Sequence, residues 1–131
     1  MATHPYDLVI PCFANNAIVR PGVRLNALLV LRPIVITDIV ASLFGPDRSA
    51  VTSEGEAYGV SANLKIGNDY VLSSPVRIRP DKLHSKEAGT VQPVVAISSV
   101  PAFSELAPEV ITYGDGAMGL CLYVIAQYVD P

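Results

Sequence analysis

The 131-residue chain contains no tryptophan, only two cysteines and few charged side chains. Charged residues make up 16% of the sequence and apolar residues 50%, a balance that excludes a disordered chain and a coiled coil. Cys12 and Cys121 stand near opposite ends of the chain, so they form neither a disulfide framework nor a metal-binding spacing. We expect two buried free thiols in a reducing compartment, which meet only if the first and last strands pair.

Long apolar runs are absent as well. The longest, residues 27–31 and 120–126, fall far short of the roughly 20 residues that a helix needs to cross a bilayer. The first residues of the chain lack the basic region and the apolar stretch of a secretory signal peptide. We therefore expect cytoplasmic synthesis and no membrane span.

Catalytic and cofactor-binding motifs are missing too. The chain has no G-x-S-x-G, no P-loop, no H-E-x-x-H and no glycine-rich dinucleotide fingerprint. Glu105 and Glu109 are four positions apart, but Pro108 between them blocks the helix that would align the two carboxylates, so we expect a solvated loop there. The sequence thus predicts a protein that is not an enzyme and has no cofactor, no metal and no identified small-molecule ligand.

The net charge is −3, which argues against a protein that binds nucleic acid by neutralising phosphates. The charges are unevenly spread, because residues 90–131 contain four acidic side chains and no basic one. Basic side chains recur at nearly every second position in one segment, at Arg77, Arg79, Lys82, His84 and Lys86. We interpret this segment as a candidate interface for the acidic third of another copy. The alternatives are charges that keep an edge strand from pairing wrongly, or charges that only solvate loops.

The sequence is rich in β-branched residues and in turn formers. Val and Ile together number 27 against 12 Leu, with 11 Pro and 9 Gly, which favours strands separated by turns. Apolar and polar residues alternate over 57–66 and again over 70–79, and Gly67 and Asn68 supply a turn between the two segments. These segments predict a β-hairpin, with Pro75 at an edge or a bulge.

The segment before this hairpin has two interpretations. Residues 23–31 and 34–36 predict strands, the first of them apolar on both faces. Thr37 then caps a short helix predicted near 38–44. The apolar residues of that helix would share one stripe: Ile39, Val40, Leu43 and Phe44. The competing prediction is one long strand, because Ile and Val are indifferent helix formers.

After the hairpin the chain becomes polar and then apolar again. Residues 80–90 predict a surface loop or an extended arm, and residues 91–100 predict a further strand. One helical turn is predicted at 104–107 and a short strand at 109–113. The glycines of residues 114–116 predict a turn in which they supply positive φ angles.

The last predicted strand, residues 120–129, is apolar on both of its faces. Tyr123 and Ile125 lie on one side, and Leu122 and Val124 lie on the other. The outer faces of an isolated two-layer sandwich are usually wetted, so this strand is either central or covered by a partner. We therefore add Tyr123 and Ile125 to the candidate interface.

Together these patterns predict one all-β domain over residues 1–131, with mainly antiparallel strands. The expected architecture is a β-sandwich or barrel of about seven strands, with at most one short helix near 38–44. We predict a non-enzymatic structural subunit that packs into a larger symmetric assembly through a protein partner or self-association. A virus or phage particle component incorporated in a virion, such as a capsid decoration (cement) or tail protein, fits this description by analogy of fold and size.

Two other functions stay open at this point. A soluble ligand-binding β-sandwich module would use its apolar faces to line a cavity instead of a contact. A small enzyme assembled at an oligomer interface would need a concave pocket that holds two or more of four side chains within hydrogen-bond reach. These four are Asp38, His84, Glu109 and Asp115.

Overall fold

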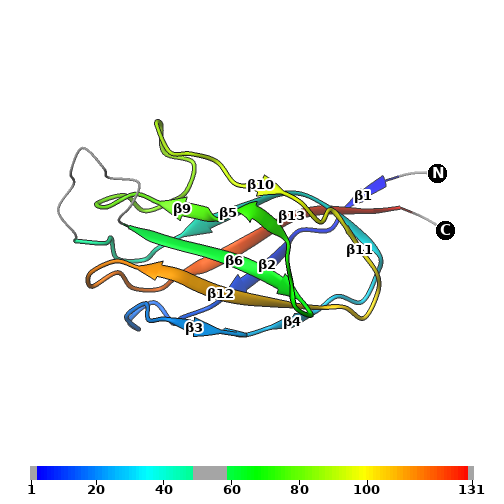
Figure 1. Cartoon of the computed structure of the whole chain (residues 1–131), viewed down its shortest axis with the longest axis horizontal. Helices are drawn as coiled ribbons and strands as arrows, with labels where there is room; N and C mark the ends of the chain where they lie inside the picture. Colours follow the sequence, from blue (N-terminus) through cyan, green and yellow to red (C-terminus); the bar gives the residue numbers. More distant parts are fainter. Residues whose placement is uncertain (1–2, 49–58, 130–131) are drawn as a thin grey trace.

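Four long strands form the centre of two antiparallel sheets (Figure 1). They are β5 (Ile34–Ser42), β6 (Val60–Ile66), β12 (Glu105–Tyr113) and β13 (Cys121–Val129). This computed structural model describes residues 3–48 and 59–129. The first two residues of the predicted strand 57–66, and Asp130 of the acidic third, lie outside the described residues.

Shorter strands extend these two sheets. They are β1 (Thr3–Pro5), β2 (Leu8–Pro11), β3 (Gly22–Val23), β4 (Leu28–Leu29), β7 (Asp69–Tyr70), β8 (Leu72–Ser74), β9 (Val76–Ile78), β10 (Val94–Val95) and β11 (Ser99–Val100). In the sheet that we call the β13 sheet, β13 lies between β5 and the pair β1 and β2, and β11 adds to the far side of β5. In the β12 sheet, β12 lies between β6 and the pair β3 and β4, while β7 and β9 pair with β6.

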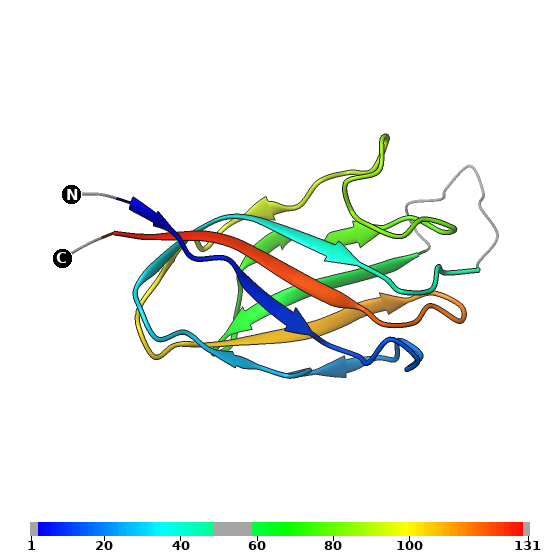
Figure 2. The same ribbon diagram turned by 180° about the vertical axis from the view of Figure 1, so that it is seen from behind.

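The two sheets stack face to face as a β-sandwich that is not closed into a barrel. Figure 1 shows the β12 sheet in front. Figure 2 shows the molecule from the opposite side, with the β13 sheet in front. Buried aliphatic side chains from alternate strand positions fill the space between them: Ile10, Ile39, Leu122 and Val124 from one sheet, and Val60, Leu64, Ile78 and Leu106 from the other. The predicted all-β, antiparallel fold is thus confirmed.

No helix occurs in residues 3–48 and 59–129, so none of this part is a helix that could cross a membrane. The helix predicted near 38–44 is wrong, and the competing prediction of one strand is confirmed. Ile39 and Ala41 of β5 are buried in the core, whereas Val40 between them is half-buried on the outer side. β5 pairs with β13 along one edge and with β11 along the other. Its β-branched side chains pack well on a pleated sheet, so the segment forms a strand instead of a helix.

β12 replaces the helical turn predicted at 104–107 and includes the short strand predicted at 109–113. Pro108 stands in the middle of this strand, although proline has no N–H to donate. Its carbonyl oxygen accepts the N–H of Leu25 at 3.2 Å, on the side where β3 and β4 leave a gap. The N–H and C=O positions of one residue point to the same side of an antiparallel strand, so the missing donor faces that gap.

The hairpin predicted from the two alternating segments is present, but its second strand is broken. β7 and β9 pair with β6, whereas β8 between them turns away and pairs with β10. Pro75 lies at this break, between β8 and β9. Two other predicted strands, 23–31 and 91–100, are each split into two short strands: β3 and β4 in the first, β10 and β11 in the second.

Candidate functional site

The basic residues of the candidate interface do not gather on one face. Arg77 lies on β9 opposite Ser61, on the outer side of the β12 sheet, because the residues on either side of Arg77 are buried in the core. The Nη1 atom of Arg79 donates to the carbonyl oxygen of Ala88 at 3.3 Å. Lys82 is exposed. The basic segment therefore leaves the β12 sheet after Arg79.

The second half of this segment reaches the other sheet. The carbonyl oxygen of Leu83 accepts the N–H of Leu43 at 2.8 Å, and the N–H of Ser85 donates to the carbonyl oxygen of Ala41 at 3.0 Å. The Ser85 hydroxyl in turn accepts the Ala41 N–H at 2.9 Å, and Ser85 is buried. Residues 80–90 thus form a loop that lies along the edge of β5 and satisfies its backbone groups.

His84 and Lys86 are held by acidic partners on this loop and on β5. Nε2 of His84 lies 3.3 Å from Oε1 of Glu87, and Nζ of Lys86 lies 2.6 Å from Oδ2 of Asp38. Asp38 is opposite Ile125 in the strand register. The structure therefore places Lys86 beside Asp38, the register partner of Ile125, and it places the two predicted arginines on the other sheet or at its edge.

Tyr123 and Ile125 lie on the outer face of the β13 sheet, because the alternate residues of β13 are buried in the core. In register, Tyr123 stands between Val9 of β2 and Val40 of β5, and Val9 is 55% exposed. We call this surface the Tyr123 face, whose apolar members are Val9, Pro11, Val40, Cys121, Tyr123 and Ile125. Ser42 lies opposite Cys121 on the same face, and its hydroxyl donates to the Tyr123 hydroxyl at 3.2 Å. Sequence reasoning missed Val9 and Val40, since only the pairing of distant strands shows that they flank Tyr123.

The edge of the β13 sheet beside this face is blocked against further strands. β1 and β2 form this edge, and the N–H groups of Tyr6 and Cys12 donate inward to the neighbouring chain at 2.9 and 3.0 Å. The N–H groups of successive residues point to opposite sides of an antiparallel strand, so the backbone nitrogens of residues 5 and 11 point outward. Both residues are proline, which has no N–H to donate to a further strand. Each of these two edge strands therefore lacks one outward N–H donor for pairing with a further strand.

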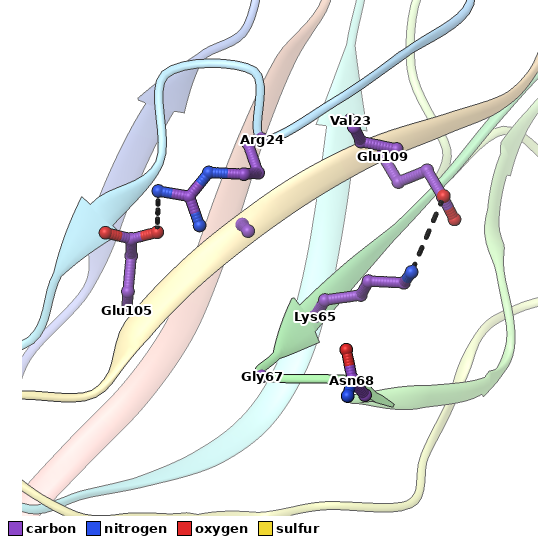
Figure 3. A pocket seen from close by; sticks show the side chains of 8 residues that line it. Val23, Arg24, Lys65, Gly67, Asn68, Glu105 and Glu109 are labelled. Atoms are coloured by element: carbon purple, nitrogen blue, oxygen red, sulfur yellow. Dashed lines mark ion pairs between the residues drawn. The ribbon is translucent and has the colours of Figure 1, made fainter.

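A hollow of about 500 Å³ lies on the outer face of the opposite sheet (Figure 3). We call it the Ala107 hollow, and it is lined by Val23, Arg24, Lys65, Gly67, Asn68, Glu105, Ala107 and Glu109. Arg24 forms an ion pair with Glu105, and Nζ of Lys65 lies 3.9 Å from Oε1 of Glu109. Two ion pairs therefore line one shallow site.

The solvated loop predicted around Glu105 and Glu109 is wrong. Both residues lie on β12, and residues four apart share one face of a strand just as they share one face of a helix. The Tyr70 hydroxyl donates a hydrogen bond to Oε2 of Glu109, and this bond raises the pKa of Tyr70 above its ordinary value. Nζ of Lys65 lies 5.0 Å from the centre of the Tyr70 ring, so the cation, the ring and the carboxylate form one cluster.

The four side chains of the enzyme alternative have separate surroundings. Asp38 pairs with Lys86, His84 with Glu87 and Glu109 with Lys65, while the N–H of Asp115 donates to Oδ1 of Asp47 at 2.6 Å. The structure does not bring these four together. Among residues 3–48 and 59–129, no three His, Cys, Asp or Glu side chains are grouped so that they could hold a metal ion.

Cys12 and Cys121 are free thiols. The first and last strands pair, with Cys121 opposite Pro11, so Cys12 lies one position further along. Because side chains alternate, the thiol of Cys12 enters the core, while that of Cys121 is only partly buried and lies on the outer face. Burial raises the pKa of Cys12 to about 12, and the nearby Cys121 thiol acts in the same direction.

No protein-family model matches this sequence, and comparisons with curated proteins and with solved structures give no significant match. The two outer surfaces of the sandwich differ in character. One is the apolar Tyr123 face, and the other contains the charged Ala107 hollow.

Proposed function

We propose that this chain is a non-enzymatic structural subunit that packs through its Tyr123 face against a second copy, within a larger symmetric assembly. The observation that carries this proposal is the contrast between the two outer faces of the sandwich. The Tyr123 face has adjacent apolar side chains on three strands, with Ser42 and Asp38 on its β5 side. On the outer face of the β12 sheet, two ion pairs lie among the exposed apolar side chains of Val23, Leu29 and Tyr70. Contiguous apolar surface gains free energy when a partner covers it.

The size of this gain argues for several contacts in one assembly. Full burial of a large apolar side chain is worth about 1.5–3 kcal/mol, and those of the Tyr123 face are already partly buried by their neighbours. Four such side chains on each of two copies contribute on the order of 10 kcal/mol, against an association cost of about 4–15 kcal/mol. One such contact is therefore weak alone, and repeated contacts in a closed assembly would stabilise it.

The rim of the face favours a second copy as the partner. A surface that meets its own copy across a two-fold axis must be complementary to itself. The ion pair between Asp38 and Lys86 lies beside Ile125 and supplies both signs of charge. Lys86 of one copy can therefore face Asp38 of the other.

We further propose a virus or phage particle as the setting of this subunit, with a role such as capsid decoration or a tail component, by analogy of size and fold. A ligand-binding β module is the second candidate function. The Ala107 hollow is the observation that favours it.

The assembly proposal is tested with two matched valine substitutions. Val9 on the Tyr123 face is 55% exposed, and Val94 on β10, outside that face, is 56% exposed. We expect the wild-type chain to sediment as a dimer or larger species as its concentration rises toward about 1 mM, and Val9→Lys to sediment as a monomer over the same range. Val94→Lys should behave as the wild type does, because it adds the same charge away from the face.

Sedimentation velocity and native mass spectrometry both read this outcome. A wild-type chain that stays monomeric over the whole concentration range would contradict self-assembly. Equal dissociation by Val94→Lys and Val9→Lys would contradict the assignment of the Tyr123 face, because the added charge alone would then explain the loss.

A further inference from the structure

We propose that the Ala107 hollow binds a neutral, polyhydroxylated ligand of about the size of a monosaccharide. The hollow lies on the β12 sheet, so this inference is independent of the assembly proposed through the β13 sheet. Its volume of about 500 Å³ falls within the range of about 300–1,000 Å³ that is typical of small-molecule sites.

Four charged side chains surround Ala107 from four directions. Glu105 and Glu109 stand two residues before and two residues after Ala107 on the same face of β12. Lys65 is directly opposite Ala107 on β6, and Arg24 follows β3 on the other side of β12. Figure 3 shows Arg24 and Lys65 on opposite sides of the hollow, each beside its glutamate.

This arrangement disfavours a ligand with a net charge. An anion placed against Arg24 or Lys65 also meets the carboxylate that pairs with that cation, and a cation near either glutamate meets the opposite repulsion. With two positive and two negative side chains, the lining has no net charge. A neutral polar ligand avoids both repulsions.

The same ion pairs suit hydroxyl groups. A hydroxyl can donate to a carboxylate and accept from a cation at the same time, and such charge-assisted hydrogen bonds are stronger than neutral ones. The guanidinium of Arg24 has five N–H donors and is exposed, so donors remain beyond the ion pair with Glu105. The amide of Asn68 adds one donor group and one acceptor, while Val23 and Ala107 offer apolar contact to the C–H groups of a sugar ring.

The test uses NMR titration of the full chain with glucose, galactose, mannose and N-acetylglucosamine. At least one of these sugars should produce saturable shifts of the amide signals of Lys65, Asn68 and Ala107, with a millimolar dissociation constant. Glycine, acetate and methylammonium serve as zwitterionic, anionic and cationic comparison probes. At the same concentrations they should leave these signals unchanged.

Substitutions locate the binding site. Ala107→Leu fills the floor of the hollow and should weaken sugar binding at least about tenfold. Ala96→Leu makes the same change at an exposed position outside the hollow and should leave binding unchanged. Should Ala107→Leu fail to fold, Arg24→Asn removes the guanidinium at the surface, and asparagine tolerates the positive φ of 57° at this position.

Three results would overturn the proposal. The first is that none of the four sugars shifts the three amide signals. The second is that glycine, acetate or methylammonium shifts them as strongly as the best sugar does, which would indicate a simple ion site. The third is that the folded Ala107→Leu and Arg24→Asn variants both bind the sugar as the wild type does.

Discussion

The side chain of Asn63 forms hydrogen bonds with backbone groups that have no neighbouring strand to pair with. We predict that removing this side chain lowers the free energy of unfolding. Where β8 turns away from β6, Oδ1 of Asn63 accepts the N–H groups of Leu72 at 3.0 Å and of Leu64 at 2.8 Å. Nδ2 of Asn63 donates to the carbonyl oxygen of Leu72 at 2.8 Å. All three residues are buried, so no bulk water reaches these groups.

The substitution Asn63→Ala leaves the N–H and the C=O of Leu72, and the N–H of Leu64, without these partners. Each buried polar group that loses its hydrogen bond costs about 1–3 kcal/mol, so three groups predict a loss of about 3–9 kcal/mol in the free energy of unfolding. A typical domain is stable by about 5–15 kcal/mol, so a loss in the lower part of the predicted range is measurable in a chain that still folds.

Urea unfolding followed by circular dichroism measures this loss, since the chain has no tryptophan as a fluorescent probe. Asn68→Ala is the matched control, because Asn68 is exposed in the turn between β6 and β7, and we expect it to change stability by less than about 0.5 kcal/mol. Amide hydrogen exchange should also show faster exchange at Leu72 in Asn63→Ala. A loss below about 1 kcal/mol, with unchanged exchange at Leu72, would refute the reasoning.

Two further predictions concern a turn and a thiol. Gly114→Ala should destabilise the fold much more than Gly116→Ala: both glycines have positive φ, but a Cβ at Gly114 would lie 2.5 Å from Cγ of Asp47, whereas a Cβ at Gly116 would have no atom within 4 Å. Equal losses in thermal unfolding would contradict this. Cys12, with a pKa raised to about 12, should react with iodoacetamide at neutral pH only after unfolding. The pKa of Cys12 is higher in the folded chain than in the unfolded chain. The protonated thiol therefore contributes its full stabilisation below pH 9, and this stabilisation is lost as the pH rises toward 12. The loss of stability over this pH range should be smaller in Cys12→Ala than in the wild type.

Local patterns predicted the parts of the fold in which alternation is strict and both neighbours are strands. The alternation before Gly67 predicted β6. The apolar residues on both faces of 120–129 predicted a strand that is either central or covered by a partner, and β13 is central in its sheet. The glycines of 114–116 have the predicted positive φ angles, 67° at Gly114 and 73° at Gly116. In these segments the local preference and the tertiary environment favour the same conformation.

The same patterns failed where one spacing fits two structures. Ile39 and Leu43 are four apart, which fits one face of a helix, but residues four apart also share one face of a strand. The hydrogen bonds between β5 and β13 stabilise the strand conformation of this segment. Glu105 and Glu109 are also four apart. Pro108 excluded a helix and led to the prediction of a loop, whereas both residues lie on one face of β12 and line the Ala107 hollow.

The sequence by itself determined that this chain folds as antiparallel strands, because β-branched residues, turn formers and a period of two are local properties that every strand displays. Only the tertiary structure decided which outward side chains become neighbours. Val9, Val40 and Tyr123 form one face, and Arg24, Lys65 and Glu105 form one hollow, through the register of strands that are distant along the chain. Register depends on how all the strands share one core, and no local pattern contains that information.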